Sequence, residues 1–418
     1  MPCELKLGPE RHALLELGNF ARLAIMAVSG GHGTFREQAQ ELFAQVRCIV
    51  SRQATPLAPI TMMVFLRDGR DEAACREIAG ESFGALMPVT TFVVQSPCSG
   101  AALGVELWAL GGPQVKIERF GPSLITTETD GIRWVYSGGI CGEARTDAYG
   151  ESATAFRVME KHLARAGIGF DQVMRTWIYV NQITDDVDGV QRYQELNRAR
   201  TDFFRNVRFG AKTRGPGAPE TIYPASTGIG TSGDAITMAC MALDTKRTDV
   251  FIVPLENPQQ TPAYDYTAHY SPQSPKFSRA MAVVQGHFVA TLVSGTASIV
   301  NSRTVFPGEI VRQTEQTLDN IEQLIAPANF AKHGMAGSGA TLRDVAKLRV
   351  YVKHQLDYER CREVVERRLP NVPAIYLIAD VCRPDLLVEI EAVAFSAFRT
   401  VTPVNGHPVN ATEPKGTA

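Results

Sequence analysis

The chain has 418 residues, which is enough for two or three domains. A hydrophobic content of 44% with 21% charged residues is that of an ordinary globular protein. The net charge of −2 gives no electrostatic reason to expect nucleic acid or a membrane surface as a partner.

Motifs for membrane insertion, secretion and metal binding are missing from the sequence. No apolar run approaches the ~18 residues of a membrane-spanning helix. The first residues mix acidic and basic side chains, which is not typical of a secretion signal. The eight cysteines form no CxxC pair, and the eight histidines form no HExxH motif. We therefore expect a cytoplasmic protein without metal or other cofactor.

Three stretches of the chain share one order of predicted elements. Each has a strand that ends in Ser-Gly, an amphipathic helix, an apolar central strand, a second helix, a strand led by proline and a closing strand. In the first stretch, which we place at residues 1–113, these elements are Ala27–Gly30, Phe35–Val50, Met63–Arg67, Asp71–Phe83, Pro88–Thr91 and Gly104–Ala109.

The second and third stretches repeat this order with similar spacing. In the second, residues 114–250, the elements are Val135–Gly138, Glu151–Ala166, Trp177–Asn181, Val190–Phe204, Pro224–Thr227 and Ala235–Cys240. In the third, residues 281–399, they are Leu292–Gly295, Glu309–Ile325, Arg349–Lys353, Leu356–Arg368, Pro373–Tyr376 and Leu387–Ala392. The segment 251–280 is expected to connect the two and to contribute to the site, and the tail 400–418 is expected to be mobile.

The order β-β-α-β-α-β-β predicts an α+β domain in which two helices lie on one face of a mixed sheet. The other face of each sheet is also apolar and must be covered. Three such units can cover these faces by packing against one another. The sequence thus predicts a pseudo-trimeric, barrel-like arrangement and a chain that acts as a monomer. Similar βα patterns can arise without common origin, but here order and spacing agree three times.

Two carboxylates interrupt the apolar closing strand of the third unit. Glu389 and Glu391 are two residues apart, so a strand places both on one face. A buried carboxylate is costly unless it is paired or protonated. This strand is therefore our candidate for acid catalysis, and an ion pair of Glu389 with Arg383 is the structural alternative.

The repeated unit resembles the YjgF/RidA family of reactive-intermediate deaminases, which form trimers with active sites between subunits. In the third unit, Phe277, Gly295 and Glu389 stand where the family has a tyrosine, a strand-end glycine and a catalytic glutamate. The family's arginine, which holds a substrate carboxylate, is replaced in the three units by Thr90, Ser226 and Ile375. Its absence argues against imine deamination.

Residues 175–398 more closely resemble the chorismatases. The resemblance rests on five separated motifs in the same order. These are Arg192–Arg200, Tyr223–Gly230, Pro262–Tyr266, Ser294–Ile299, and Ala379–Arg383 followed by Glu389-Ile-Glu391. The resemblance implies an enzyme that removes the enolpyruvyl side chain of chorismate as pyruvate.

The resemblance also implies which second product forms. Gly295, and Cys382 seven residues before Glu389, match the pocket of the group that makes 3-hydroxybenzoate. Two alternatives stay open at this point. One is a hydrolytic chorismatase that gives a dihydroxycyclohexadiene carboxylate plus pyruvate. The other is a RidA-like ligand-binding protein without enzymatic activity.

Chorismate is a dicarboxylate with an enol ether, and cleavage of this ether needs a proton on the methylene carbon. The resemblance implies that Glu389 donates this proton from a desolvated pocket, with Glu391 as a supporting group. Fork-shaped cations suit the two substrate carboxylates, and our candidates are Arg279, Arg349 and Arg383. We predict that Phe277 and Tyr376 contact the faces of the substrate ring and that Cys382 shapes the pocket with its thiol. Gly295, which has no side chain, is predicted to leave room for the ring.

The first two units are predicted to be scaffold. We align Glu106 of the first unit and Thr237 of the second with Glu389. Threonine cannot act as the acid, and the sequence around Glu106 lacks the pocket motifs. The third unit is therefore expected to hold the single working site.

Overall fold

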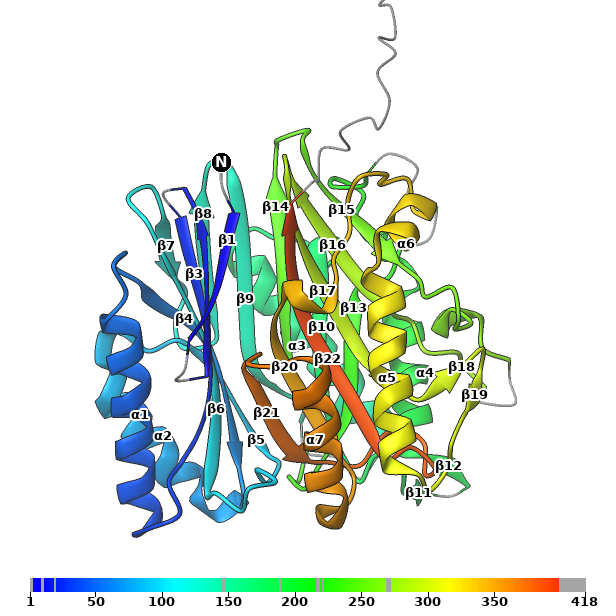
Figure 1. Cartoon of the computed structure of the whole chain (residues 1–418), viewed down its shortest axis with the longest axis horizontal. Coiled ribbons are helices and arrows are strands. Elements are labelled where there is room, and N and C mark those ends of the chain that lie inside the picture. The colour runs from blue at the N-terminus through cyan, green and yellow to red at the C-terminus, as the bar shows by residue number, and fades with distance from the viewer. Residues whose placement is uncertain are drawn as a thin grey trace, which may run out of the picture.

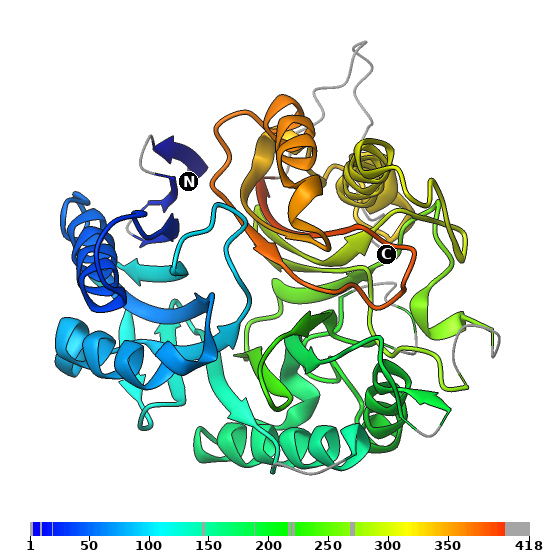
Figure 2. The same cartoon turned by 90° about the horizontal axis from the view of Figure 1, so that it is seen from below.

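The computed structural model describes residues 3–397 except 9–10, 19, 144–146, 188, 216–218, 220–221 and 268–271. These residues form three six-stranded sheets, each with helices on one face (Figure 1). Figure 2 shows the three groups around a common centre, with the helices on the outside. The predicted mobile tail, 400–418, lies outside the described residues.

The first sheet has the strand order β1-β2-β3-β6-β4-β5, with β4 and β5 parallel and the other neighbours antiparallel. Its elements are β1 (Cys3–Gly8), β2 (His12–Leu17), β3 (Phe20–Val28), α1 (Phe35–Ser51), β4 (Ala58–Leu66), α2 (Glu72–Phe83), β5 (Val89–Val94) and β6 (Leu103–Gly111).

The second sheet has the equivalent order β7-β8-β9-β14-β10-β13. Its elements are β7 (Lys116–Arg119), β8 (Leu124–Thr129), β9 (Ile132–Cys141), α3 (Ala148–Arg165), β10 (Val173–Asn181), α4 (Arg192–Phe204), β13 (Ala225–Thr231) and β14 (Thr237–Thr245). A short hairpin of β11 (Asp186–Val187) and β12 (Val190–Gln191) precedes α4.

The third sheet repeats the order once more, as β15-β16-β17-β22-β20-β21. Its elements are β15 (Val250–Leu255), β16 (Ala280–Gln285), β17 (Phe288–Ala297), α5 (Ile310–Ile325), α6 (Pro327–Lys332), β20 (Val345–Val352), α7 (Tyr358–Arg368), β21 (Ala374–Ile378) and β22 (Val388–Ala397). The hairpin of β18 (Ile299–Val300) and β19 (Arg303–Thr304) precedes α5.

The α+β class and the predicted order of elements are confirmed, with one extra strand at the start of each unit. In the third unit this strand is β15, which lies inside the segment 251–280 and pairs with β16. Local sequence explains the helix starts, as at α1, where Thr34 and Glu37 form a capping box. The unit boundaries themselves remain a prediction.

The inner faces of the three sheets pack against one another, as their apolar character requires. One buried cluster combines Met26 and Phe65 of the first unit, Tyr179 and Ile229 of the second, and Tyr351 of the third. The outer faces bury the apolar stripes of the helices, for example Leu318, Ile321 and Leu324 of α5. The core is therefore shared at the centre, with separate clusters under the helices of the first and third units and a cluster in the second unit that continues into the inner faces.

Neighbouring sheets meet without closing into a barrel. Within the described residues, the hydrogen-bonded strands remain three separate sheets, so the barrel-like closure expected from the sequence is not confirmed. Instead, β13 lies against β17, β5 against β9 and β21 against β3. Single bridges, such as that of Ala225 with Ser278, cross these contacts. The sheets do not close into a barrel because neighbouring sheets contact each other through side chains and a few hydrogen bonds, and not through a continuous ladder of backbone hydrogen bonds.

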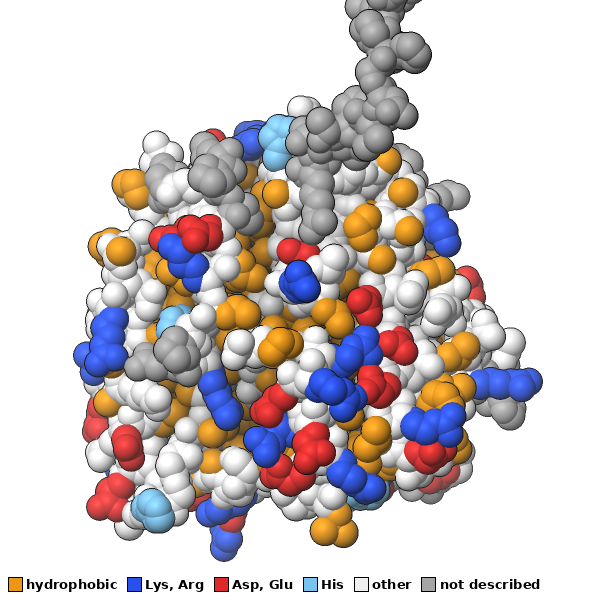
Figure 3. Space-filling model, viewed as in Figure 1, with side chains coloured by type: hydrophobic (Ala, Val, Ile, Leu, Met, Phe, Trp, Pro, Cys, Tyr) orange, Lys and Arg blue, Asp and Glu red, His pale blue; other side chains and the backbone are white. Residues whose placement is uncertain are grey.

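The outer surface carries acidic and basic side chains side by side, in keeping with the small net charge. Figure 3 shows them intermixed over the face formed by α5 and α7. There Arg368 of α7 pairs with Glu315, Asp319 and Glu322 of α5 at N–O distances of 2.8 to 3.0 Å. Among the described residues, no helix is long and apolar enough to cross a membrane.

Candidate active site

A cavity of about 220 Å³ lies where the second unit meets the third. One water needs only ~10–15 Å³ of such space, so a small organic molecule has room here. Six of the residues predicted for the site line this cavity together, namely Phe277, Arg279, Gly295, Cys382, Arg383 and Glu389. The second unit contributes the opposite wall with Gln191, Tyr193, Arg200, Ser226 and Gly228.

Glu389 of β22 is the only carboxylate among the described residues that line this cavity. The residue is 5% exposed. Burial, helped by the negative charge of Glu391, raises the pKa of Glu389 to about 8 against the opposing effect of Arg175 and Arg279. Its carboxyl is therefore protonated at neutral pH and able to donate a proton.

A β-bulge in β17 brings Gly295 next to this carboxyl. The register of β17 against β22 shifts between Val293 and Thr296, which leaves Ser294 and Gly295 without partners in the ladder. A Cβ atom on Gly295 would lie 1.9 Å from Oε1 of Glu389. The carboxyl thus occupies the space that a side chain at this position would need.

Strand β13 of the second unit holds the bulge in place. The N–H of Ser226 donates to Oγ of Ser294 at 2.9 Å, and that hydroxyl donates to the carbonyl oxygen of Ser278 at 2.6 Å. The N–H of Gly295 donates to Oγ1 of Thr227 at 3.1 Å. The position of the carboxyl in the third unit therefore depends on a strand of the second.

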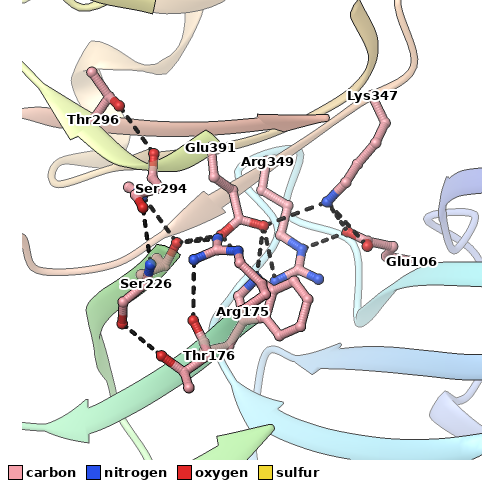
Figure 4. A network of polar contacts seen from close by, with 12 residues as sticks. Glu106, Arg175, Thr176, Ser226, Ser294, Thr296, Lys347, Arg349 and Glu391 are labelled. Atoms are coloured by element: carbon pink, nitrogen blue, oxygen red, sulfur yellow. Dashed lines mark hydrogen bonds and ion pairs between the residues drawn. The ribbon is translucent and has the colours of Figure 1, made fainter. Parts of the chain in front are cut away.

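Glu391 does not line the cavity but belongs to a buried ion network (Figure 4). Its carboxylate accepts hydrogen bonds from three groups of the second unit. These are Nη2 of Arg175 at 2.9 Å, Nε1 of Trp177 at 3.1 Å and Oγ1 of Thr227 at 2.6 Å. Glu391 thereby ties the third unit to the second.

Two cations of β20 complete the surroundings of Glu391. Nη1 of Arg349 lies 3.2 Å and Nζ of Lys347 lies 3.4 Å from its Oε1 atom. Burial works to raise the pKa of Glu391, but Arg349, Arg175 and Lys347 outweigh it and lower the pKa to about 2. Glu391 is therefore ionised at neutral pH, in contrast to Glu389.

The first unit contributes Glu106 to the same network. Nζ of Lys347 lies 3.1 Å from its carboxylate, and Nε of Arg349 donates to it. Nε1 of Trp108 donates to its other oxygen at 2.8 Å. Burial opposes the charge of Glu106, but Arg349 and Lys347 outweigh it and lower the pKa. The network thus joins all three units.

The pairing of strands shows that the alignment of Glu106 with Glu389 is wrong. Met63 and Arg349 begin the matched central strands, and they pair with Glu106 and Glu391 respectively. Glu106 therefore matches Glu391. Gly104 pairs with Phe65 as Glu389 pairs with Tyr351, so Gly104 holds the place of the acid in the first unit.

The structure does not bring Arg349 or Tyr376 to the cavity. Arg349 is 1% exposed and is engaged by Glu106, Glu391 and the Tyr179 hydroxyl. Tyr376 lies on the helix-covered face of β21, where its ring packs on Tyr358 at a centroid distance of 5.4 Å. Neither is placed to contact a ligand in the cavity.

The cavity residues that the sequence did not predict include Tyr193 and Arg200 of α4 and Tyr266 of the loop before β16. Arg200 is 2% exposed, and its guanidinium lies 5.8 Å from the centre of the Phe277 ring. The Tyr266 hydroxyl accepts a hydrogen bond from Nη2 of Arg279 at 2.6 Å. The motifs Arg192–Arg200 and Pro262–Tyr266 contain all three residues and were the available signal.

Arg200 and Arg279 are buried cations whose hydrogen-bonding capacity is not filled. The Nε atom of each has no hydrogen-bond partner among the described residues. Burial lowers the pKa of Arg200, whereas for Arg279 the effect of burial is outweighed by Tyr266 and Glu256, which raise the pKa. Two guanidiniums in one cavity favour an anionic ligand, and carboxylates match their geometry.

Two family models match the chain. Residues 107–242 match the model described as Chorismatase FkbO/Hyg5-like, N-terminal, and residues 271–396 match the model Endoribonuclease L-PSP. A 3-hydroxybenzoate synthase of Streptomyces hygroscopicus is 33% identical over 300 residues, which cover 69% of this chain and 80% of the relative. The chain belongs to the chorismatase family.

Two further chorismatases agree with this membership. A chorismatase of Streptomyces hygroscopicus is 33% identical over 270 residues, which cover 63% of this chain and 74% of that protein. A chorismatase crystal structure matches with a TM-score of 0.63 and 23% identity, and the match covers 89% of this chain and 98% of that one. The likeness of the two structures shows that this chain has the chorismatase fold.

The two residues matched to the 3-hydroxybenzoate-forming chorismatases, Gly295 and Cys382, both lie in the cavity with Glu389. Burial, with a smaller contribution from Glu389, raises the pKa of the Cys382 thiol to about 12. A neutral thiol is a poor nucleophile, so the geometry favours a role for Cys382 in shaping the cavity. Within the described ranges, His, Cys, Asp and Glu side chains form no group of three that could hold a metal ion.

Proposed function

We propose that this chorismatase-family chain cleaves chorismate into 3-hydroxybenzoate and pyruvate. The relative named 3-hydroxybenzoate synthase, 80% of which the chain covers, supports this product. The observation that carries the proposal is the Glu389 carboxyl. It is buried, its pKa of about 8 keeps it protonated at neutral pH, and the other charged residues that line the cavity are arginines.

The chemistry follows from the enol ether. Glu389 transfers its proton to the methylene carbon, which makes the ether an oxocarbenium ion and leads to release of pyruvate. In the 3-hydroxybenzoate route, the ring hydroxyl next to the ether attacks the ring carbon that bears the ether oxygen. The bond between that carbon and the oxygen breaks and pyruvate leaves, and loss of one ring proton, which restores the Glu389 acid, gives the aromatic product. The atoms of 3-hydroxybenzoate and pyruvate together then equal those of chorismate, so no water is consumed. The hydrolytic route adds one water instead.

Arg200 and Arg279 are the proposed ligands of the substrate carboxylates, with Arg383 at the rim. Both Arg200 and Arg279 line the cavity and are at least 97% buried, and the Nε atom of each has no hydrogen-bond partner among the described residues. Arg383 donates to the carbonyl oxygen of Ser302 at 2.9 Å, and its guanidinium lies 5.3 Å from the Tyr266 ring centre. With Glu389 neutral, the cavity carries a net positive charge that suits a dianion.

We further propose that the three units form a pseudo-trimer in one chain and that the protein is a monomer. The equivalent strand order of the three sheets and the shared central cluster support this arrangement. Light scattering at micromolar concentration should give the mass of one chain. A stable species of three chains would contradict the proposal.

The function is tested by incubating the protein with chorismate. We expect pyruvate release and 3-hydroxybenzoate in the mass spectrum, with kcat/KM falling above pH ~8 as Glu389 loses its proton. Glu389→Gln should abolish pyruvate release, whereas Glu366→Gln on the outer face of α7 should not. A hydrated diene product without 3-hydroxybenzoate would identify the hydrolytic reaction. Absence of pyruvate from the wild type would reject enzymatic cleavage of chorismate.

A further inference from the structure

Thr227 of β13 makes three hydrogen bonds with its one hydroxyl group. Oγ1 accepts from the N–H of Gly295 at 3.1 Å and from Nη2 of Arg175 at 2.6 Å, and it donates to Oε2 of Glu391 at 2.6 Å. A hydroxyl has one proton to donate and two lone pairs, so Thr227 is saturated. Because the ionised Glu391 can only accept, the direction of each bond is fixed.

This arrangement determines what the N–H of Gly295 can bind. Oε1 of Glu389 lies against Gly295, in the place that a Cβ atom would take. An N–H that donated to this carboxyl would favour its ionised form and weaken it as an acid. The Thr227 hydroxyl gives that N–H another acceptor.

We propose that Thr227 is a positioning residue that keeps the Glu389 carboxyl in its proton-donating form by binding the N–H of the bulged Gly295. Thr227 does not line the cavity among the described residues, so it acts through Gly295 and not on the ligand. The inference rests on the proposed function, because it concerns the same acid.

Other groups also act on Glu389 and must stay constant in a test of Thr227. They come from every element packed around the carboxyl. The titratable and charged neighbours are Glu391 on β22, Arg175 on β10, Tyr193 on α4, Arg279 before β16 and Cys382 before β22. A variant at Thr227 keeps all of these side chains. Thr227→Val also removes the hydrogen bonds of the hydroxyl to Arg175 and Glu391, whereas Thr227→Ser keeps them.

The chain contains a matched control for this experiment. At the contact of the first and second units, Oγ1 of Thr91 accepts the N–H of Gly139 at 2.9 Å, in the bulge of β9. Thr237, which cannot titrate in this range, stands there at the position of Glu389. Thr91→Val therefore removes the corresponding hydrogen bond at a contact that has no carboxyl at the position of Glu389.

The test compares Thr227→Val, Thr227→Ser and Thr91→Val with the wild type in chorismate cleavage from pH 6 to 9. In Thr227→Val we expect the alkaline limb of kcat/KM to move down by about one pH unit and kcat at pH 9 to fall about tenfold, with a smaller change in KM. Thr227→Ser keeps the hydroxyl and should keep the wild-type profile. Thr91→Val should also keep it.

Two results would overturn the proposal. One is a wild-type pH profile in Thr227→Val. The other is an equal loss of activity in Thr91→Val, since that would assign the effect to packing between units. Melting temperatures are recorded for all variants, and if Thr227→Val does not fold, Thr227→Ala is measured under the same criteria.

A readout without catalysis separates this inference from the proposed function. The folded pKa of Glu389, about 8, is above its ordinary value of 4.5, so its contribution to stability is complete below pH ~4.5 and is lost as pH rises to ~8. In Thr227→Val this pH-dependent loss of melting temperature should end about one pH unit earlier, even if chorismate is not the substrate. An unchanged melting profile would count against Thr227 alone.

Discussion

The contact between the second and third units and the contact between the first and second are built alike. In each, a strand of one unit (β13 or β5) lies against a bulged strand of the next (β17 or β9). In each, a threonine accepts the N–H of a glycine in the bulge, Thr227 from Gly295 and Thr91 from Gly139. Among the described residues, the strand contact and the threonine–glycine hydrogen bond of the active site therefore occur twice.

The two contacts differ in the chemistry that this scaffold carries. Glu389 of the third unit is replaced by Thr237 in the second. The cleft beside Thr237 has a volume of about 550 Å³, and its charged residues are largely neutralised in exposed pairs such as Arg76 with Glu72. Of the three contacts, as formed by the described residues, only that of the second and third units places buried arginines in one cavity with a neutral carboxyl.

At the contact between the third and first units, an isoleucine takes the place of the acid's side chain. Gly104 stands at the place of the acid, and Cδ1 of Ile375 lies 2.7 Å from where its Cβ atom would be. Ile375 belongs to β21, the counterpart of β13. Ile375 thus occupies the place that the side chain of an acid at position 104 would need. The three equivalent positions are therefore occupied by Glu389, Thr237 and Gly104.

We call the contact of the second and third units the active contact and that of the first and second units the silent contact. The largest effect is expected when Glu389 of the active contact is replaced by threonine, the residue at the equivalent position of the silent contact. Glu389→Thr removes the proton donor, and general acid catalysis contributes about 10²- to 10⁴-fold to rate. Pyruvate release from chorismate, followed at pH 7, should fall by about that factor. Thr237→Val at the silent contact should leave the rate within twofold. A comparable loss in both variants would mean that the two contacts do not differ in function.

A smaller effect, on stability, is expected from Glu391→Gln. Removal of this charge leaves Arg175, Arg349 and Lys347 with one carboxylate, Glu106, and breaking a buried ion pair costs about 3–5 kcal/mol. The folded pKa of Glu391, about 2, is below its ordinary 4.5, so its contribution is present above pH ~4.5 and is lost as pH falls towards 2.

Urea unfolding at pH 7 and pH 3 measures this effect. The difference between wild type and Glu391→Gln should be large at pH 7 and smaller at pH 3. Ala239 holds the place of Glu391 in the second unit, so the network depends on the third unit alone for this charge. A constant difference at both pH values would show that lost packing, and not lost charge, destabilises the variant.

Local motifs were sufficient to find much of the site. Gly295, Cys382 and Glu389 lie on or beside one strand pair, so their sequence spacing reflects their distance in space. Arg349 was misjudged because its position on the inner face of β20 leaves open whether it faces a cavity or the centre. Arg349 faces the centre, where it donates a hydrogen bond to Glu106. Glu106 belongs to another unit and is 243 residues away in the sequence.

The misalignment of Glu106 has a different physical cause. A strand repeats its facing every two residues, so a slip of two residues keeps every side chain on its face. The apolar pattern of β6 therefore fits β22 equally well in both alignments. Only the pairing of Glu106 with Met63 and of Glu391 with Arg349 distinguishes them. Strand pairing is a tertiary fact that one sequence does not contain.

The smallest effect distinguishes the arginines of the two contacts, buried Arg200 and exposed Arg76, by their influence on KM. Arg200→Gln removes a cation from the active cavity, and a hydrogen bond to a charged group contributes about 1.5–3 kcal/mol, so KM for chorismate should rise about 10- to 100-fold with a smaller change in kcat. Arg200→Lys keeps the positive charge but not the planar guanidinium that can donate two hydrogen bonds to one carboxylate, so an intermediate KM is expected.

Arg76→Gln is the control, because Arg76 lines the cleft of the silent contact and pairs with Glu72 in solvent. It should leave KM unchanged. Steady-state kinetics at pH 7 with melting temperatures for each variant decide the question. If Arg200→Gln binds chorismate as the wild type does, the buried guanidinium supports α4 through Asn197 and the substrate carboxylate must be held by Arg279 or Arg383. A rise in KM for Arg200→Gln but not for Arg76→Gln would place anion binding in the active contact, where the unfilled Nε atoms are found.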